Sequence, residues 1–409
     1  MVHLPMAGVR VLEVAQFTFT PAAGAVLTEW GADVIKVEHA ETGDAQRGLR
    51  IGPYAPAEGS FAPIMDHPNR GKRSIGVAIE TPSGREVLMD LVRTSDVFLT
   101  NFLPDARRRL GIDVEDLRKV NPNIIYVRGS AHGQRGPESE SGGFDGTAFW
   151  CRGGSAWSAT PPDCPRPISM PGGAYGDTIG GMTIAGGIAA ALYARQATGE
   201  PSVVDVSLLG VGIWSMALNV SNALMTGTNI EQPPLSAPVA AIANPFVGLF
   251  ETSDHRWLTL SILQPGRYFA DTCKHLGLDH LTEDERFATA EGIMAGTDEI
   301  REQVTRALAS QPFSYWLDRL QTLEGQWAPL QNQLELGADP QVLANGYLVD
   351  VVDAEGGTRR LVANPVQFDE QPPAGARGPL FAEHTDDILR ELGKTEDEMI
   401  QLKVEGACT

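Results

Sequence analysis

The first 40 residues follow a strand–helix–strand order, and this order restricts the fold more than any other feature of the sequence. Residues 9–14 (VRVLEV) and 34–37 (VIKV) are β-branched runs, and residues 21–30 (PAAGAVLTEW) between them begin with proline, as helices often do. Two strands joined by such a crossover helix lie parallel. Ligands of parallel sheets bind beyond the carboxyl ends of the strands. The sequence therefore predicts binding loops at residues 16–20 and 38–42.

A dinucleotide site is the first candidate for such a sheet. Glu38 follows the second strand, where a ribose-binding acid would lie. However, the loop after the first strand reads QFTFTP (residues 16–21) and lacks the glycines that let a pyrophosphate approach a helix N-terminus. The sequence therefore disfavours a nicotinamide cofactor.

Composition narrows the class of protein. At 409 residues the chain exceeds one ordinary hydrophobic core, and its formal charge of −20 argues against nucleic-acid and anionic-membrane partners. No apolar run reaches the roughly 20 residues of a membrane span, and no signal-peptide pattern is evident. The four cysteines lack CxxC spacing, and His275 and His280 lack neighbouring metal ligands. We expect a cytoplasmic protein with no metal site.

Changes of pattern divide the chain into domains. Strands and helices alternate up to residue 128, residues 137–173 are rich in Gly, Pro and Ser without a periodic pattern, and residues 246–262 predict a hairpin. We expect an α/β fold with a large Rossmann-like parallel-sheet domain, built from N- and C-terminal segments, and a smaller α+β domain. The apolar run 203–225 predicts a buried helix, and residues 202–206 at its start are expected to be extended. The expected boundaries are 1–205 for the N-terminal part of the large domain, 206–233 for a linker helix, 234–327 for the small domain, 328–345 for a second linker and 346–409 for the return to the large domain.

Two stretches carry candidate site residues. Asp177 lies among the glycines of residues 172–181 (GGAYGDTIGG), directly before an apolar helix. Glycines allow close approach of backbone to a ligand, and a helix N-terminus favours negative charge. From this stretch alone a helix cap is the simpler interpretation of Asp177, and a carboxylate offered to a substrate is the alternative. In the second stretch Arg70, Lys72 and Arg73 precede an apolar strand, where they predict an anion site.

Five motifs, in order along nearly the whole chain, resemble those of one family. They are residues 8–14 (GVRVLEV) with 31–38 (GADVIKVE), 72–75 (KRSI) with 81–86 (TPSGRE), 101–102 (NF) with 109–111 (RLG), 121–122 (NP) with 133–137 (GQRGP), and 378–380 (GPL) with 383–385 (EHT). The chain resembles class III acyl-CoA transferases of the CaiB/BaiF type. Formyl-CoA transferase, carnitine CoA-transferase and α-methylacyl-CoA racemase belong to this superfamily.

The resemblance implies a site, substrates and a quaternary structure. The family's catalytic aspartate lies in a Gly-Asp pair heading a small-residue helix, which corresponds to Asp177. Acyl-CoA and carboxylic acids are the implied substrates, with no permanently bound cofactor, and the chain is expected to form an interlocked homodimer. CoA contacts are expected from Thr18, His39, Lys72, Arg73, Asn101 and Arg109. Pocket and oxyanion contacts are expected from His132, Gly133, Gln134, Phe144 and Trp150.

The expected reaction moves CoA from an acyl-CoA to a carboxylic acid. Asp177 attacks the thioester to give an aspartyl anhydride, and the CoA thiolate returns to give an aspartyl-CoA thioester. The helix N-terminus is expected to keep Asp177 ionised at pH 7, so that no general base is needed. The neighbouring glycines are expected to leave room for the thioester.

An α-methylacyl-CoA racemase is the alternative. The racemases of this superfamily use a histidine in a Gly-His-Asp triplet together with the aspartate, and here the triplet is residues 143–145 (GFD). Phe144 cannot carry a proton, which leaves His132 as the histidine that could substitute. The sequence therefore favours the transferase. Residues 261–267 lack the glycine-rich lid of formyl-CoA transferases, which disfavours formyl and oxalyl groups.

Overall fold

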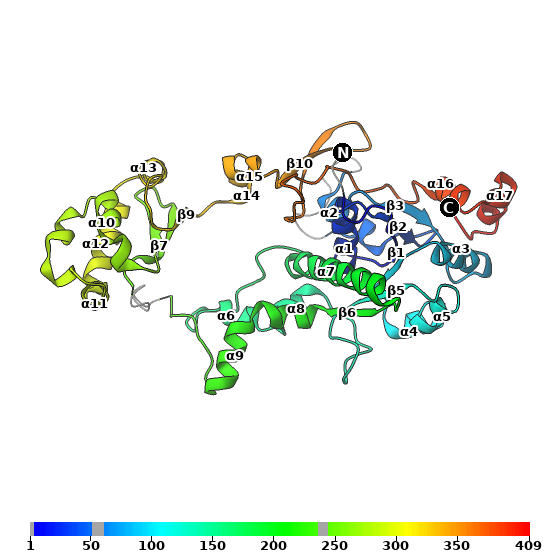
Figure 1. Cartoon of the computed structure of the whole chain (residues 1–409), viewed down its shortest axis with the longest axis horizontal. Coiled ribbons are helices and arrows are strands. Elements are labelled where there is room, and N and C mark those ends of the chain that lie inside the picture. Colours follow the sequence, from blue (N-terminus) through cyan, green and yellow to red (C-terminus); the bar gives the residue numbers. More distant parts are fainter. Residues whose placement is uncertain (1–3, 51–60, 236–243) are drawn as a thin grey trace. The chain divides into compact units, whose positions relative to one another are not determined.

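The computed structural model describes residues 4–50, 61–235 and 244–409. Its main sheet has six parallel strands in the order β3-β2-β1-β4-β5-β6 (Figure 1). The sheet confirms the predicted α/β class, and its strand order reverses between β1 and β4, where ligands of such sheets bind. The strands are β1 (Arg10–Val14), β2 (Asp33–Glu38), β3 (Arg73–Gly76), β4 (Val97–Thr100), β5 (Ile125–Ser130) and β6 (Val203–Ser207).

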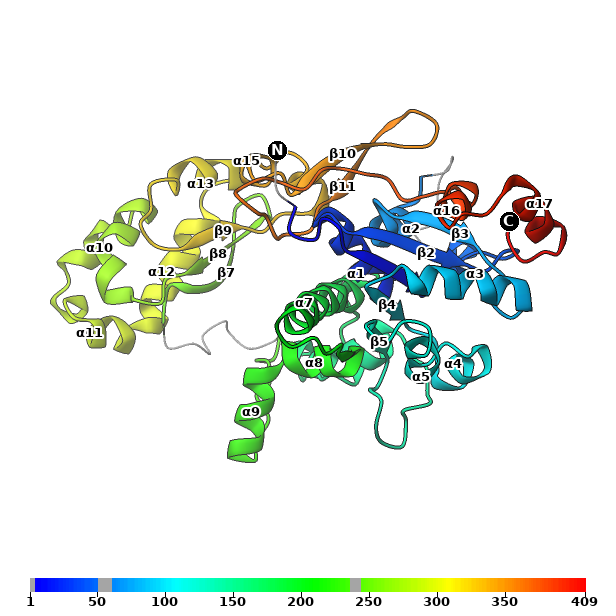
Figure 2. The same cartoon turned by 45° about the vertical axis from the view of Figure 1, so that its right-hand side comes forward.

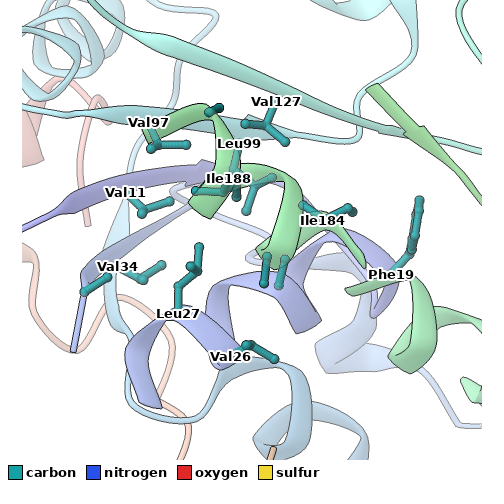
Figure 3. Packing of buried hydrophobic residues seen from close by; sticks show 14 of the residues in the cluster. Val11, Phe19, Val26, Leu27, Val34, Val97, Leu99, Val127, Ile184 and Ile188 are labelled. Carbon is teal, nitrogen blue, oxygen red and sulfur yellow. The ribbon is translucent and has the colours of Figure 1, made fainter. Parts of the chain in front are cut away.

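Helices cover both faces of this sheet (Figure 2). Val11 of β1 points to the face covered by α1 (Phe19–Glu29) and α7 (Tyr175–Thr198), whereas Leu12 points to the other face. Such a strand is buried on both sides, as the β-branched runs predict. The first face is drawn in Figure 3, with Val26, Leu27, Ile184 and Ile188 of the helices against Val11, Val97, Leu99 and Val127 of the sheet. The second face is covered by α3 (Pro82–Arg93), α5 (Val114–Arg118), α16 (Thr385–Glu391) and α17 (Glu396–Val404).

A buried ionic cluster joins β1 and β2. Glu13 and Lys36 are partners in the strand register, and Lys36 Nζ lies 3.2 Å from Glu13 Oε1 and 2.8 Å from Asp44 Oδ2. Lys72 Nζ lies 2.7 Å from Glu13 Oε2, and all four side chains are fully buried. Buried charges persist only when each is paired, and here each is. A Cβ at Gly24 of α1 would overlap the Glu13 carboxylate, so the helix can lie this close only with glycine there.

The chain divides into two compact units. The first comprises residues 1–159, 167–230 and 340–409, and the second comprises residues 160–166 and 231–339. The second unit has an antiparallel sheet, β7 (Val247–Glu251), β8 (Trp257–Ser261) and β9 (Trp327–Pro329), and its own hydrophobic core. Its helices are η4 (Asp279–Glu283), η5 (Glu285–Phe287), α10 (Pro265–Leu276), α11 (Ala290–Ala295), α12 (Thr297–Ala309), α13 (Phe313–Arg319) and α14 (Gln333–Leu336).

The predicted helix over residues 203–225 and the linker helix over residues 206–233 are wrong, whereas the expected extended conformation is confirmed for residues 203–206. Val203–Ser207 forms β6, the edge strand of the main sheet, because its β-branched residues suit a strand. Two short helices follow, α8 (Leu208–Ser215) and α9 (Ala217–Thr226), and α9 has no buried residue. Among the described residues no single helix is long and apolar enough to cross a membrane, and α8 with α9 reach that length only as a pair bent by 73°.

The predicted irregular stretch over residues 137–173 contains two helical segments, a π-helix at Asp145–Cys151, named η3, and α6 (Ser155–Ala159). The remaining elements of the first unit are short. They are η1 (Ala45–Gly48), α2 (Pro63–Asn69), α4 (Pro104–Leu110), α15 (Pro340–Ala344) and the antiparallel hairpin β10 (Leu348–Val352) with β11 (Thr358–Val362). The C-terminal segment thus returns to the first unit, where α16 and α17 complete its core.

Candidate active site

The candidate active site lies where the strand order reverses, at the carboxyl ends of β1 and β4. Gln16 follows β1 and Asn101 follows β4. The Gln16 backbone N–H donates to Asn101 Oδ1 at 3.0 Å, and Asn101 Nδ2 donates to the Gln16 carbonyl at 2.7 Å. The Asn101 side chain therefore satisfies the backbone of the neighbouring loop and fixes the two loops to each other.

Asp177 lines a cavity of about 190 Å³ beside these loops. It is the third residue of α7, and its side chain is partly buried. Among the described residues that line this cavity, Asp177 is the only acid and Arg107 the only base. The apolar wall is formed by Phe17, Phe19, Phe102, Leu103, Phe144 and Leu208. A ligand bound in this largely apolar cavity would therefore contact a single carboxylate, that of Asp177.

A second carboxylate, Asp145, lies against the start of α7. It is buried at the beginning of the π-helix and accepts hydrogen bonds from the backbone N–H groups of Gly146, Gly176 and Asp177. Its Oδ2 has no hydrogen-bond partner within the described part of the chain. Two N–H groups of the first turn of α7 are therefore occupied by Asp145.

Burial, and after it the charge of Asp145, raises the pKa of Asp177 to about 8. The expectation that the helix N-terminus keeps Asp177 ionised at pH 7 is therefore wrong, because burial and the charge of Asp145 disfavour the ionised form. With a pKa of about 8, roughly one Asp177 in ten is ionised at pH 7. The ionised form is poorly solvated, which favours reaction with an electrophile.

The glycines next to Asp177 serve the packing of aromatic rings. A Cβ at Gly176 would overlap the ring of Phe149, and a Cβ at Gly180 would overlap the ring of Phe19. The expectation that these two glycines leave room for a thioester is therefore wrong. Their absent side chains allow Phe149 and Phe19 to pack against α7, and Phe19 in turn forms part of the cavity wall.

Two aromatic side chains of the cavity meet each other. The rings of Phe17 and Phe144 pack edge to face with 5.5 Å between their centroids, and Phe144 is 61% exposed. Phe17 has a φ of 64°, which is unfavourable for a residue with a side chain. Its backbone N–H donates to Asp44 Oδ1 at 3.1 Å, and Asp44 is the partner of Lys36 in the buried cluster. The ionic cluster thus holds Phe17 in its strained conformation.

Three of the predicted CoA contacts lie on connected cavities. His39 and Arg109 line a cavity of about 320 Å³ beyond the ends of β1 and β2, which shares Gln16 and Phe102 with a further cavity lined by Asn101. That further cavity shares Asn101 and Phe102 with the Asp177 cavity. Arg109 is 72% exposed, and its one ion-pair partner in the described chain, Asp105, is 3.9 Å away. A continuous surface therefore leads from Arg109 to Asp177.

The contacts of the His39 ring fix its orientation and its tautomer. Its Nδ1 accepts hydrogen bonds from the backbone N–H groups of Glu41 and Thr42 at 3.2 and 3.3 Å. The proton of the neutral ring is therefore on Nε2, which lies 3.0 Å from Glu80 Oε1. The carboxylate of Glu80 holds the ring at the edge of the cavity, which both residues line.

The predicted anion site at Arg70, Lys72 and Arg73 is wrong, because each of these cations already has a carboxylate partner. Arg70 Nε lies 2.7 Å from Glu29 Oε1, and the buried Lys72 donates to Glu13. Arg73 stands at the first residue of β3, away from the carboxyl ends of the strands, and pairs with Asp33 and Glu391 at 2.7 and 2.6 Å. Lys72 and Arg73 therefore stabilise the fold, which contradicts the prediction that they contact CoA.

The remaining predicted site residues differ in their positions. Gln134 lines the Asp177 cavity, and its Oε1 accepts from Arg107 at 3.3 Å. The Gly133 N–H donates to Ser130 Oγ at 3.1 Å, which removes it as a free oxyanion donor. Thr18 is buried and donates to Gln46 Oε1 at 2.9 Å.

His132 and Trp150 do not line the cavity. His132 Nε2 is 3.8 Å from Glu138, and Trp150 donates to the Ile168 carbonyl at 3.0 Å.

Metal ligation has no support in the described ranges, which contain no group of three or more His, Cys, Asp or Glu side chains able to hold an ion. What the site offers is a partly buried carboxylate, carried by α7, in a cavity at the switch point of a parallel sheet. Such an arrangement is typical of enzymes that use a carboxylate as a nucleophile or as a proton acceptor.

The chain belongs to CoA-transferase family III, whose model matches residues 6–385. It is 32% identical over 398 residues to succinate–glutarate CoA-transferase of Agrobacterium fabrum, with 96% of each chain covered. It is 27% identical over 401 residues to (R)-2-hydroxy-4-methylpentanoate CoA-transferase of Clostridioides difficile, with 97% of each covered. Among solved structures, a CaiB/BaiF family protein of Brucella suis has a TM-score of 0.79 and 28% identity, covering 96% of this chain and 100% of that one. The chain is therefore an enzyme of the CoA-transferase class.

Two site residues escaped the sequence reasoning. Asp145 is separated from Asp177 by a stretch without periodic pattern, and only the packing of the π-helix on α7 brings the two carboxylates together. Arg107 lies in a run of three arginines, of which the sequence singled out Arg109. Helical spacing was the available signal, since Arg107 is buried and Arg109 is exposed on the same helix.

Proposed function

We propose that this enzyme transfers CoA from an acyl-CoA to a carboxylic acid through covalent intermediates on Asp177. The observation that carries the proposal is the position of Asp177, the only acid among the described residues of a mostly apolar cavity, connected by a continuous surface to His39 and Arg109. A desolvated carboxylate next to a thioester carbonyl is a nucleophile without further activation.

The first half-reaction consists of two displacements. A carboxylate oxygen of ionised Asp177 attacks the thioester carbonyl carbon, the C–S bond breaks, and CoA leaves as a thiolate with the bonding pair. The thiolate then attacks the Asp177 carbonyl carbon of the mixed anhydride. The C–O bond to the acyl carboxylate breaks, so that the donor acid leaves and CoA remains on Asp177 as a thioester.

The acceptor acid completes the cycle by the same chemistry. Its carboxylate attacks the aspartyl thioester, the CoA thiolate leaves, and an anhydride between the acceptor and Asp177 forms. The thiolate attacks the acceptor's carbonyl carbon, which releases the new acyl-CoA and restores the Asp177 carboxylate. Protons are neither gained nor lost overall, so the enzyme needs Asp177 ionised but needs no proton donor.

Gln134 is the side chain best placed to stabilise the oxyanion of each addition step. Arg107 donates to Gln134 Oε1, which leaves the Nε2 amide hydrogens as the free end of that side chain. Both residues line the Asp177 cavity. A fixed amide donor and a nearby guanidinium in a poorly solvated space stabilise developing negative charge more than water does.

The nucleotide portion of CoA is proposed to occupy the cavity of His39 and Arg109. The guanidinium of Arg109 has only a distant ion-pair partner in the described chain, so it is available to a phosphate. The His39 ring can stack on the adenine or contact a phosphate. The pantetheine arm then follows Gln16, Asn101 and Phe102 to place the sulfur at Asp177.

The relatives are named for different carboxylic acids. One relative is named for two dicarboxylic acids and another for a branched 2-hydroxy acid. What the names share is the movement of CoA between carboxylic acids, and this is the function proposed here.

A second copy of the chain is proposed to cover α9. This helix has no buried residue, and it exposes Leu218 by 86% together with Leu224 and Met225. Apolar patches of this kind mark interaction surfaces. A homodimer, which the sequence resemblance implies, would remove them from water.

The proposal is tested with wild-type enzyme and the D177N variant. Wild-type enzyme should transfer CoA from acetyl-CoA or succinyl-CoA to at least one member of a panel of carboxylic acids, and D177N should lose at least about 10³-fold in kcat, as nucleophile variants do. Turnover by D177N close to that of wild type would contradict the assigned nucleophile.

The racemase alternative is tested by incubating the enzyme with a 2-methylacyl-CoA in deuterium oxide without an acceptor acid. Phe144 stands where a proton-transferring histidine would be needed, and His132 does not line the cavity. We expect no deuterium at the α-carbon. Deuterium exchange as fast as the CoA transfer measured with an acceptor acid would instead assign the enzyme to the isomerases.

A further inference from the structure

A second, larger cavity adjoins the Asp177 cavity. Its volume is about 590 Å³, and it lies beyond the carboxyl ends of β5 and β6. Its lining is rich in hydrogen-bond donors, from Ser130, Gln134, Ser139 and Ser207, and it contains four arginines: Arg107, Arg108, Arg128 and Arg135. In a chain with a formal charge of −20, a cavity with four arginines and two acids is a local reversal of charge.

The two acids of this cavity are already paired. Arg128 binds Asp205 through two contacts of 2.6 and 2.9 Å, and Arg108 binds Glu140 through two contacts of 3.2 and 3.1 Å. Arg135 has neither a hydrogen-bond nor an ion-pair partner among the described residues. The guanidinium of Arg135 is therefore free to bind an anion, and its planar fork matches a carboxylate.

The two cavities share a boundary. Pro104, Arg107, Ser130, Gln134 and Ser139 line both of them. Arg107 is almost fully buried at this boundary, donates to the Phe102 carbonyl and to Gln134 Oε1, and its Nε has no hydrogen-bond partner in the described chain. The arginine-lined cavity therefore lies directly beside the Asp177 cavity, and a chain-like ligand attached at Asp177 would reach it past Gln134.

The position of this cavity decides which part of the substrate it receives. The cavity of His39 and Arg109 adjoins the Asp177 cavity at Phe102, whereas the arginine-lined cavity adjoins it at Arg107 and Gln134. With the thioester at Asp177, CoA extends toward one and the acyl group toward the other.

We infer that the arginine-lined cavity binds the distal carboxylate of a dicarboxylic acyl group, with Arg135 as the residue that determines this specificity. The inference rests on the proposed function, because it assigns the class of acid that the transferase uses. Arg135 touches neither the thioester nor Asp177; it selects the substrate by pairing with the carboxylate at the far end.

The first test compares acids of equal length. CoA transfer from acetyl-CoA is measured to succinate and butyrate, to glutarate and pentanoate, and to adipate and hexanoate. The dicarboxylate of at least one pair should have a kcat/KM at least about 10-fold above that of its monocarboxylate, the discrimination expected for one charge-assisted pair. Transfer to all acids without such a preference overturns the inference while leaving the proposed function intact; no transfer to any acid overturns the proposed function.

The second test uses the R135Q variant, with R93Q as the matched control. Arg93 is an exposed residue of α3 paired with Asp90, remote from both cavities. R135Q should lower kcat/KM for the preferred dicarboxylate by about 10- to 100-fold and for the matching monocarboxylate by less than about twofold, whereas R93Q changes neither. Equal losses for both acids, or no loss for either, overturn the inference. Equal melting temperatures of the two variants exclude a folding defect.

A phosphate of CoA is the other anion that the cavity could hold, and binding distinguishes the two. Calorimetric titration of 3′,5′-ADP into wild-type enzyme and into R135Q should give the same Kd within about twofold. The Kd of the preferred dicarboxylate for CoA-saturated enzyme should be at least about 10-fold higher in R135Q than in wild type. A comparable loss for 3′,5′-ADP would place a nucleotide phosphate at Arg135 and overturn the inference.

Discussion

The raised pKa of Asp177 makes a quantitative prediction about pH. In the proposed reaction only the ionised carboxylate of Asp177 attacks the thioester, so kcat/KM should follow the ionised fraction of Asp177 in the free enzyme. With a pKa of about 8, this fraction is roughly 0.09 at pH 7 and roughly 0.91 at pH 9. We therefore expect kcat/KM to rise about tenfold between pH 7 and pH 9 and then to level off. Initial rates of CoA transfer, measured by chromatography of the acyl-CoA species from pH 6 to pH 10, test this directly.

The variant D145N isolates the second cause of the raised pKa. The asparagine keeps a carbonyl oxygen that can accept from the N–H groups of Gly176 and Asp177 but removes the negative charge. The midpoint of the pH profile should fall, and it should remain above the ordinary range of an aspartate, because burial is the larger cause. D397N, a change at an exposed residue of α17, should leave the midpoint in place. A flat wild-type profile between pH 6 and pH 9, or an unchanged midpoint in D145N, would refute the reasoning.

Three further predictions concern stability and assembly. The folded-state pKa of Asp177 lies above its unfolded value, so its protonated form stabilises the fold and this contribution is lost as pH rises through about 8. The Tm of D177N minus the Tm of wild type should therefore increase by at least about 2 °C when the pH is raised from 7 to 9.5. Tm curves that stay parallel over this range would contradict this. K72M should lower the free energy of unfolding, measured in urea, by about 3 kcal/mol, because Glu13 loses one of its two buried cations. A loss below about 1 kcal/mol would show that the Lys72–Glu13 pair is not important for stability. L218E should reduce the sedimentation mass of the wild-type assembly if a second copy covers α9, and an unchanged mass would remove α9 from the interface.

Local pattern predicted the sheet because strands and crossover helices are encoded over short distances. The β-branched runs at residues 9–14 and 34–37 predicted β1 and β2 to within about one residue at each end. The cations of Arg70, Lys72 and Arg73 were misinterpreted because their acidic partners lie on other elements. One signal was available: Glu13 and Lys36 each interrupt an apolar strand, and charges in such positions indicate a buried pair across neighbouring strands.

The chemistry of the site depended on contacts that no local pattern encodes. The position of Asp177 in the first turn of a helix followed from its glycines, but the pairing with Asp145 arises only when the π-helix packs against α7. The hydrophobicity of Ala217–Thr226 indicated burial without indicating the partner, and within the described chain this helix is exposed. Apolar pattern specifies that a face will be covered, not whether the same chain covers it.

The central claim is that Asp177 carries the acyl group and then CoA. The most direct measurement is the mass of the peptide that contains Asp177 after the enzyme is incubated with a reactive acyl-CoA and no acceptor acid. The account predicts a peptide bearing CoA as a thioester on Asp177, which hydroxylamine converts to the hydroxamate and borohydride reduces to the alcohol, with no modification in D177N. Unmodified Asp177 in an enzyme that transfers CoA, or modification at another residue, would contradict the claim.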